Sequence, residues 1–197
     1  MRRRTKMRDD GQVFRVAVLL SLAVASSGPV VQVCDLDGRA WTPLTPASGE
    51  INLLVFIASD CPISNRYAPE IDRIAAAYAP RRVRTFLVYA DSRAAASQVR
   101  AQVHEFHPSL RAPVIIDRGL ALTEAAGATV TPEAVIVTGR GRVYRGRIDD
   151  WYENAGQARR AAQRHDLRDA LDATLAGRPV AQPETTAIGC FIERGLK

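Results

Sequence analysis

The chain has 197 residues, enough for one domain of ordinary size, and 47% of them are hydrophobic, as in a globular protein with a buried core. Its formal net charge is +6, but residues 1–25 hold six basic and two acidic side chains and account for four of those charges. The rest of the chain is close to neutral, which argues against the strongly basic surface that binds DNA or RNA. We therefore expect no nucleic-acid partner.

The first 25 residues have the pattern of an export signal. A basic stretch precedes the apolar run Val16–Ala25, and Ala23-Val24-Ala25 fits the small-x-small sequence at which such signals are cleaved. As a helix this run would rise about 15 Å, about half of a bilayer core, so a membrane span is not expected. The sequence predicts a periplasmic or secreted protein, with an uncleaved N-terminal anchor as the alternative. Only this segment is expected to contact a membrane.

From residue 28 onward the pattern alternates between strands and helices. The apolar run at 51–57 is typical of a strand that is buried on both faces. The other predicted strands lie at 30–36, 83–90 and 112–116, with a hairpin at 131–148. Helices are predicted from Pro62 onward and at 93–106, 120–126 and 166–175. This order predicts an α/β domain over residues 28–180, with a central mixed β-sheet and helices on both faces, followed by a tail at 181–197.

The three cysteines cannot all pair within one monomer, so at least one is a free thiol or bonds to another molecule. None of them is spaced as zinc ligands are, and we expect no metal and no cofactor. Cys34 lies in the first predicted strand, where we expect a buried core thiol. His104 and His107 are expected to be solvated at the end of a helix.

Cys61 is the residue whose position most clearly indicates chemistry. The buried strand at 51–57 leads into it, and Pro62 then begins a helix. The N-terminus of a helix offers unpaired N–H groups and a partial positive charge, which lower the pKa of a cysteine placed there. Arg66 lies close enough in the sequence to add to this effect. The sequence therefore predicts a nucleophilic thiolate at Cys61.

The segment around Cys61 resembles the active-site region of the thioredoxin-like superfamily, in its redoxin or alkyl-hydroperoxide-reductase-like (peroxiredoxin-like) group. Cys61 matches the first cysteine of the thioredoxin Cys-x-x-Cys motif, and Ser64 stands where the second cysteine would be. Thr131-Pro132 matches the cis-proline that faces the active cysteine. The resemblance covers about residues 30–178.

This resemblance implies a thioredoxin-like fold and thiol–disulfide chemistry. It also implies that the backbone around Thr131 and Pro132 holds an extended segment of substrate. Without a cysteine at 64, a mixed disulfide on Cys61 needs another thiol to resolve it. Cys190, in the tail, is the candidate, and a structural Cys61–Cys190 disulfide is the alternative.

Two departures from the family pattern weaken a peroxidase interpretation. Peroxidatic cysteines sit in Pro-x-x-x-Thr-x-x-Cys, and the chain has Leu54 and Ala58 at the proline and threonine positions. The groups that would organise a bound peroxide are therefore missing.

The sequence thus predicts an extracytoplasmic thiol–disulfide oxidoreductase that acts on a protein thiol or disulfide partner. One alternative is a non-enzymatic binding module or copper metallochaperone, for which Cys61, Cys190 and His165 would have to converge. The other is a one-cysteine peroxidase, in which Cys61 is oxidised to a sulfenic acid.

Overall fold

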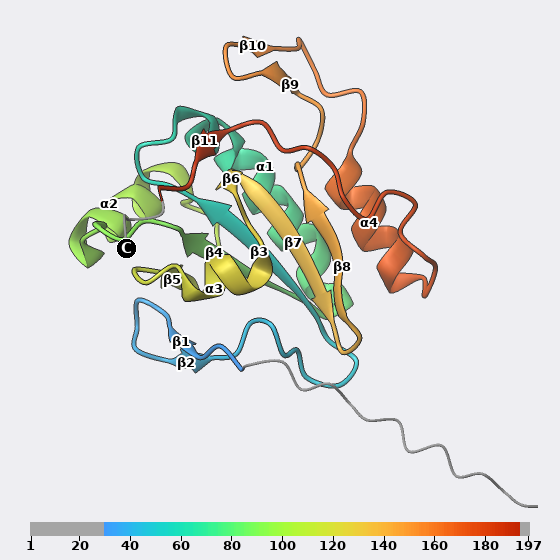
Figure 1. The fold of residues 1–197 in the computed structure, drawn as a ribbon, viewed down its shortest axis with the longest axis horizontal. Coiled ribbons are helices and arrows are strands. Elements are labelled where there is room, and N and C mark those ends of the chain that lie inside the picture. Colours follow the sequence, from blue (N-terminus) through green and yellow to red (C-terminus); the bar gives the residue numbers. More distant parts are fainter. Residues whose placement is uncertain (1–29, 194–197) are drawn as a thin grey trace, which may run out of the picture.

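The computed structural model describes residues 30–193, which form a five-stranded sheet with helices on both of its faces (Figure 1). The strand order is β5-β4-β3-β7-β8. These strands are β3 (Ile51–Ile57), β4 (Val83–Tyr89), β5 (Val114–Ile116), β7 (Glu133–Thr138) and β8 (Gly141–Gly146). β3, β4 and β5 run parallel, whereas β7 runs antiparallel to both β3 and β8. The predicted α/β class and mixed sheet are confirmed.

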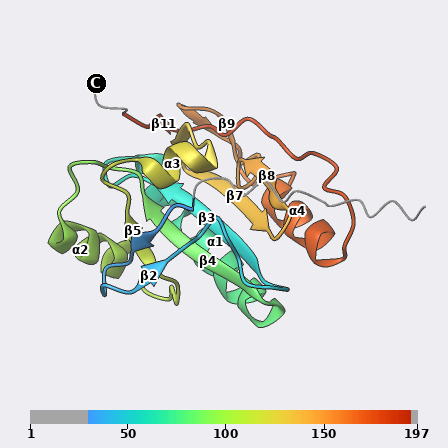
Figure 2. The ribbon, with the colours of Figure 1, turned by 60° about the horizontal axis from the view of Figure 1, so that its bottom comes forward.

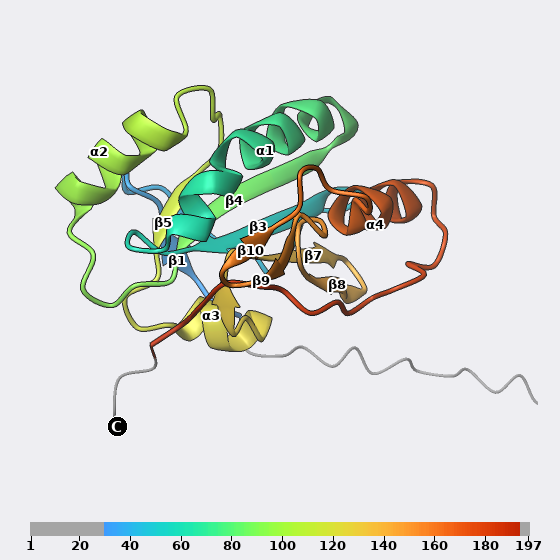
Figure 3. The same ribbon diagram turned by 90° about the horizontal axis from the view of Figure 1, so that it is seen from above.

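The helices divide between the two faces of the sheet, as Figure 3 shows from above. Three of them, α1 (Pro62–Tyr78), α2 (Ala96–Phe106) and α4 (Asp166–Leu175), pack on one face. The shorter α3 (Ala121–Ala126) packs on the opposite face. A 3₁₀ turn, η1 (Ala79–Arg81), joins α1 to β4. Within the described residues no helix is long and apolar enough to cross a membrane.

The central strand β3 has apolar side chains on both of its faces, so both faces of the sheet must be packed against other elements. All seven of its residues are buried, and successive side chains of a strand point to opposite faces. Leu53, Val55 and Ile57 pack in the core that includes α1, α2 and α4. Leu54 and Phe56 pack in the second core with α3. A continuous apolar run in the sequence therefore corresponds to a two-sided core, which fixes the end of β3 where Cys61 follows.

Within residues 30–193, three small two-stranded sheets complete the fold (Figures 1 and 2). β1 (Val33–Cys34) pairs with β2 (Ala40–Trp41). β9 (Tyr152–Asn154) pairs with β10 (Gln157–Ala158), a hairpin that was not expected from the sequence. β6 (Val130–Thr131) pairs with β11 (Cys190–Phe191), so the C-terminal tail returns to the sheet.

Two expectations from the sequence are wrong. The strand expected at 30–36 is only two residues long, and Cys34 is exposed, because alternation along this edge strand turns Val33 toward the core and Cys34 toward solvent. His107 is buried rather than solvated. The packing of α2 against α1 brings the His107 Nδ1 atom to 2.6 Å from the Asp72 carboxylate. The predicted export signal lies outside the described residues.

Candidate active site

Cys61 lies where β3 leads into α1, and it is the N-cap residue of that helix. Its backbone is extended, and Pro62 follows in the first turn, where the missing N–H leaves no bond unmade. The sulfur accepts a hydrogen bond from the Ser64 backbone N–H at 3.5 Å. The side chain is fully buried, with an exposed fraction of 0%. The helix N-terminus thus holds the sulfur in the way that stabilises a thiolate.

The Thr131–Pro132 segment faces this cysteine from the neighbouring part of the sheet. Its peptide bond is cis, as the family resemblance implies. β7 begins directly after Pro132 and pairs with β3, which brings Thr131 close to the end of that strand. The Cys61 thiol donates a hydrogen bond to the Thr131 carbonyl oxygen at 3.1 Å.

The tail brings a second thiol to the same place. β11 runs antiparallel to β6, with Cys190 opposite Thr131 in the register. In this position the Cys190 side chain lies beside Cys61 and influences its pKa, and both residues are free cysteines in this structure. Figure 1 shows the tail running from the end of α4 back to β6. The fold therefore places together two cysteines that are 129 positions apart in the sequence.

The two thiols have opposite shifts in pKa. Burial raises the pKa of Cys61, but hydrogen bonds from the side chains of Cys190, Ser64 and Thr131 and from the Ser64 backbone outweigh burial and hold the pKa below its usual value. Burial, the hydrogen bond to Cys61 and the negative charge of Cys61 and Asp60 raise the pKa of Cys190 to about 12. Ionisation is thus concentrated on Cys61, while Cys190 keeps its proton. The thiolate is the nucleophilic form of cysteine, and the protonated thiol is not.

Ser64 occupies the place of the second cysteine in the resembled motif, and it is 1% exposed. Its hydroxyl has no hydrogen-bond partner among the described residues, yet it is one of the groups that lower the pKa of Cys61. The neutral Cys61 thiol donates a hydrogen bond to the Thr131 carbonyl. Once Cys61 has ionised, the Ser64 hydroxyl can donate to the sulfur, and the two observations then agree. Ser64 is thus placed to stabilise the thiolate.

Replacing Ser64 by alanine is expected to raise the pKa of Cys61 and to slow its reaction with a disulfide at pH 7 by about tenfold. A hydrogen bond to a charged group contributes about 1.5–3 kcal/mol, and the greater nucleophilicity of a more basic thiolate offsets part of this loss. Ultraviolet titration of the thiolate in a Cys34→Ser background measures the shift. Ser64→Thr keeps the hydroxyl and is the matched control. An unchanged titration curve for Ser64→Ala would contradict this role.

Arg66, whose position in the sequence suggested a role, lies at the edge of the site together with Asp60, the residue before Cys61. The Arg66 guanidinium donates to the Tyr152 hydroxyl at 3.4 Å, and burial and hydrogen bonds, not Arg66, are the largest influences on the pKa of Cys61. Asp60 is exposed and acts on Cys190, whose pKa it raises. The negative charge next to Cys61 in the sequence therefore helps to keep the second thiol protonated.

A buried polar pair behind Pro132 was not found from the sequence. The Tyr67 hydroxyl donates to Asp149 at 2.5 Å, and both side chains line a small cavity with Pro132. Burial is the main cause that raises the pKa of both groups. Tyr67 lies on the apolar face of α1, so its sequence position indicated only core packing. The pair braces α1 against the segment that precedes α4.

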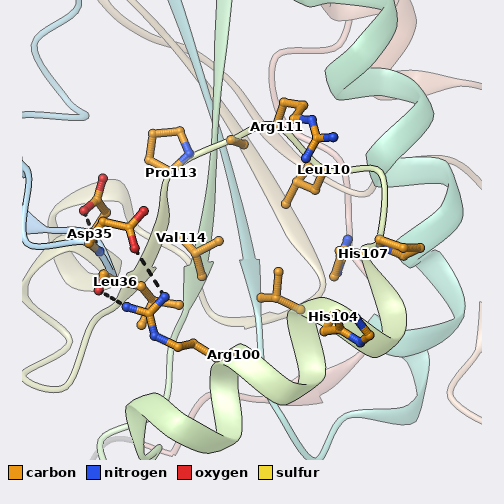
Figure 4. A pocket seen from close by; sticks show the side chains of 13 residues that line it. Asp35, Leu36, Arg100, His104, His107, Leu110, Arg111, Pro113 and Val114 are labelled. Carbon is orange, nitrogen blue, oxygen red and sulfur yellow. Dashed lines mark hydrogen bonds and ion pairs between the residues drawn. The ribbon is translucent and has the colours of Figure 1, made fainter.

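A separate hollow of about 430 Å³ lies between α2 and the loop that leads to β5 (Figure 4). Several of its polar groups have partners within the chain. Arg100 bonds to the Leu36 carbonyl and to Asp37, and His107 bonds to Asp72. Cys61 and Cys190 do not line this hollow.

No group of three or more histidine, cysteine, aspartate or glutamate side chains is close enough to hold a metal ion within residues 30–193. The convergence of Cys61, Cys190 and His165 that a copper site requires is therefore not found there. His165 instead precedes the first residue of α4 as its N-cap.

A model of the Redoxin family matches residues 23–153, which include Cys61 and Pro132 but not Cys190. A hypothetical protein from Sinorhizobium meliloti shares the fold with a TM-score of 0.70 and 25% identity, over 85% of this chain and 92% of that one. An uncharacterized conserved protein from Geobacillus kaustophilus shares the fold with a TM-score of 0.72 and 24% identity, over 86% of this chain and 90% of that one.

A secreted disulfide oxidoreductase of Mycobacterium tuberculosis, homologous to Escherichia coli DsbE, has the same fold with a TM-score of 0.52 and 19% identity, over 75% of this chain and 96% of that one. No curated protein sequence matches the chain. The thioredoxin-like fold expected from the sequence is thus confirmed.

Proposed function

Because the chain belongs to the Redoxin family, we propose that it is an extracytoplasmic thiol–disulfide oxidoreductase whose redox pair is Cys61 and Cys190. The observation that carries the proposal is the contact between the two thiols, one with a lowered and one with a raised pKa. Cys61 is the nucleophile, and Cys190 is the resolving thiol that a cysteine at position 64 would otherwise supply.

The first step is attack by the Cys61 thiolate on a disulfide of a partner protein. A bond forms between Cys61 and one partner sulfur, the partner's S–S bond breaks, and its other sulfur leaves as a thiolate that takes up a proton. The helix N-terminus and Ser64 stabilise the attacking thiolate before this step. The Thr131 carbonyl and Pro132 border the sulfur on the side from which the partner approaches.

The second step resolves the mixed disulfide. Once Cys61 is bonded to the partner, it no longer carries the negative charge that raises the pKa of Cys190. Cys190 can then lose its proton and attack the Cys61 sulfur. A Cys61–Cys190 bond forms and the second partner sulfur leaves as a thiolate. Two electrons have passed from this chain to the partner disulfide, and an external dithiol donor returns them.

The extracytoplasmic location is supported by the sequence pattern of residues 1–25, with its basic stretch, apolar run and cleavage-like end. The Mycobacterium protein of the same fold is described as secreted. Outside the cytosol a disulfide between the two cysteines would persist until a specific donor reduces it.

The test is the reduction of a fluorescence-quenched peptide disulfide, with dithiothreitol as the donor. The protein lacking residues 1–25 should accelerate the reaction in proportion to its concentration, and Cys34→Ser should leave the rate unchanged, since Cys34 is exposed in β1. A rate equal to that of dithiothreitol alone would overturn the proposal.

A further inference from the structure

We propose that residues 189–192 of the tail are a resident peptide in the site where the partner's polypeptide binds, and that the partner must displace them. The inference rests on the proposed function and names its substrate class. That substrate is an extended segment in which glycine directly precedes the cysteine that Cys61 attacks. The tail and the partner compete for the same strand, β6.

The tail lies on β6 as a bound strand would. Cys190 is opposite Thr131, Phe191 is opposite Val130, and the Ile192 N–H donates to the Thr129 carbonyl at 3.1 Å. β6 has β11 as its paired strand among the described residues. Addition of an extended peptide to such a strand supplies main-chain hydrogen bonds whatever the sequence of the peptide. The sulfur of the resident strand meets Cys61, as the sulfur of a partner must.

The fit is tightest at Gly189. A Cβ atom added there would overlap the carbonyl group of Thr131, the same carbonyl that accepts the Cys61 hydrogen bond. Because this obstacle is backbone, no side-chain rotation relieves it. A segment that binds β6 in the same register therefore needs glycine at this position. The tail itself shows the sequence that the site accepts.

The tail is attached in a way that allows its end to leave. Upstream, Thr185 and Pro183 make backbone hydrogen bonds to Arg145 on β8, at 3.0 and 2.9 Å. These contacts can persist while residues 189–192 detach. At the end only Ile192 is buried in the core, whereas Phe191 is 86% exposed and loses little on release. A groove of about 600 Å³ continues beside β6 and Phe191, and gives a longer peptide room to bind.

Displacement also explains how a partner reaches Cys61, which is fully buried in the present arrangement. The tail is tethered and therefore competes with the partner at a high effective concentration. It slows the reaction of Cys61 with every partner that binds β6 no more tightly than the tail does. After the partner has reacted, Cys190 returns along the same strand to attack the Cys61 sulfur. One segment thus covers the nucleophile and delivers the resolving thiol.

The experiment uses the protein with Cys34→Ser and Cys190→Ser, in which Cys61 is the remaining thiol and the tail keeps its backbone pairing. The probe copies residues 186–192 as Thr-Ala-Ile-Gly-Cys-Phe-Ile, with its cysteine in a mixed disulfide with thionitrobenzoate. A second probe has valine in place of glycine. Release of thionitrobenzoate and the mass of the product together report attack by Cys61.

Adding Gly189→Ala, which prevents the tail from binding β6, should raise the rate with the glycine probe at least tenfold. Gly139→Ala, where an added Cβ meets nothing within 4 Å, should leave the rate unchanged. Ile192→Ser should open the site independently. With the site open, the valine probe should react at least tenfold more slowly than the glycine probe.

Equal rates with and without Gly189→Ala, at a Cys61 that does react, would overturn the displacement and leave the proposed function intact. Equal rates for the glycine and valine probes would overturn the substrate assignment. A Cys61 that reacts with neither probe nor with free dithiobisnitrobenzoate, in any variant, would overturn the proposed function itself.

Discussion

Cys61→Ser is expected to lower the rate of catalysed peptide-disulfide reduction by at least about a thousandfold, since serine supplies no thiolate and loss of a catalytic nucleophile has effects of this size or larger. Serine is also a preferred N-cap residue, so α1 should keep its start and the fold its stability. The initial rate above that of dithiothreitol alone measures the effect.

Cys34→Ser is the matched control for this variant, because it makes the same substitution at an exposed cysteine outside the site. Thermal unfolding should give similar midpoints for both variants. If Cys61→Ser kept more than a tenth of the wild-type rate, another group would be the nucleophile and the assignment of Cys61 would be wrong.

Cys190→Ser is expected to separate the two steps. The first attack by Cys61 should still occur, because its thiolate retains the helix N-terminus and the Ser64 hydrogen bonds. The mixed disulfide should then accumulate, and multiple turnover should fall by about a hundredfold, because the donor must resolve the intermediate from solution instead of by a tethered thiol. Quenching with acid and mass spectrometry should show one substrate molecule bound to each chain.

Cys190→Ala, which leaves no side-chain donor at this position, also removes one of the influences that lower the pKa of Cys61. The first attack should therefore depend more steeply on pH near neutrality than in the wild type, and it should become faster as the pH rises. A Cys190→Ser variant that turns over at the wild-type rate, with no mixed disulfide, would show that the donor resolves the intermediate directly.

Much of the fold can be predicted from residues with strong local preferences. The apolar run of β3 and the apolar spacing of α4 indicated both elements at the bounds that the structure has. Cys61 could be located because a buried strand, a cysteine and Pro62 follow one another in the sequence. These features depend on neighbours within a few positions, which the sequence displays directly.

The pairing of β11 with β6 depends on tertiary structure. Two-residue strands have no periodicity to detect, and their register is set by the place where the rest of the fold holds Thr131. One signal was present in the sequence. Gly189 stands directly before Cys190, and Ile192 lies two positions after Cys190, the spacing at which side chains of a strand share a face. The burial of His107 depends likewise on the packing of α2 against α1, about which α2's own sequence says little.

The reduction potential of Cys61 and Cys190, with the disulfide identified by peptide mapping, is the decisive measurement for the proposed redox pair. Protein lacking residues 1–25 is equilibrated in redox buffers, trapped with an alkylating agent and digested. The proposal predicts one two-electron transition that forms a Cys61–Cys190 disulfide, with a potential between about −120 and −270 mV, the range of thiol–disulfide oxidoreductases. A disulfide that stays oxidised below about −300 mV would identify a structural bond, and the absence of that disulfide at every potential would show that the two thiols are not a redox pair.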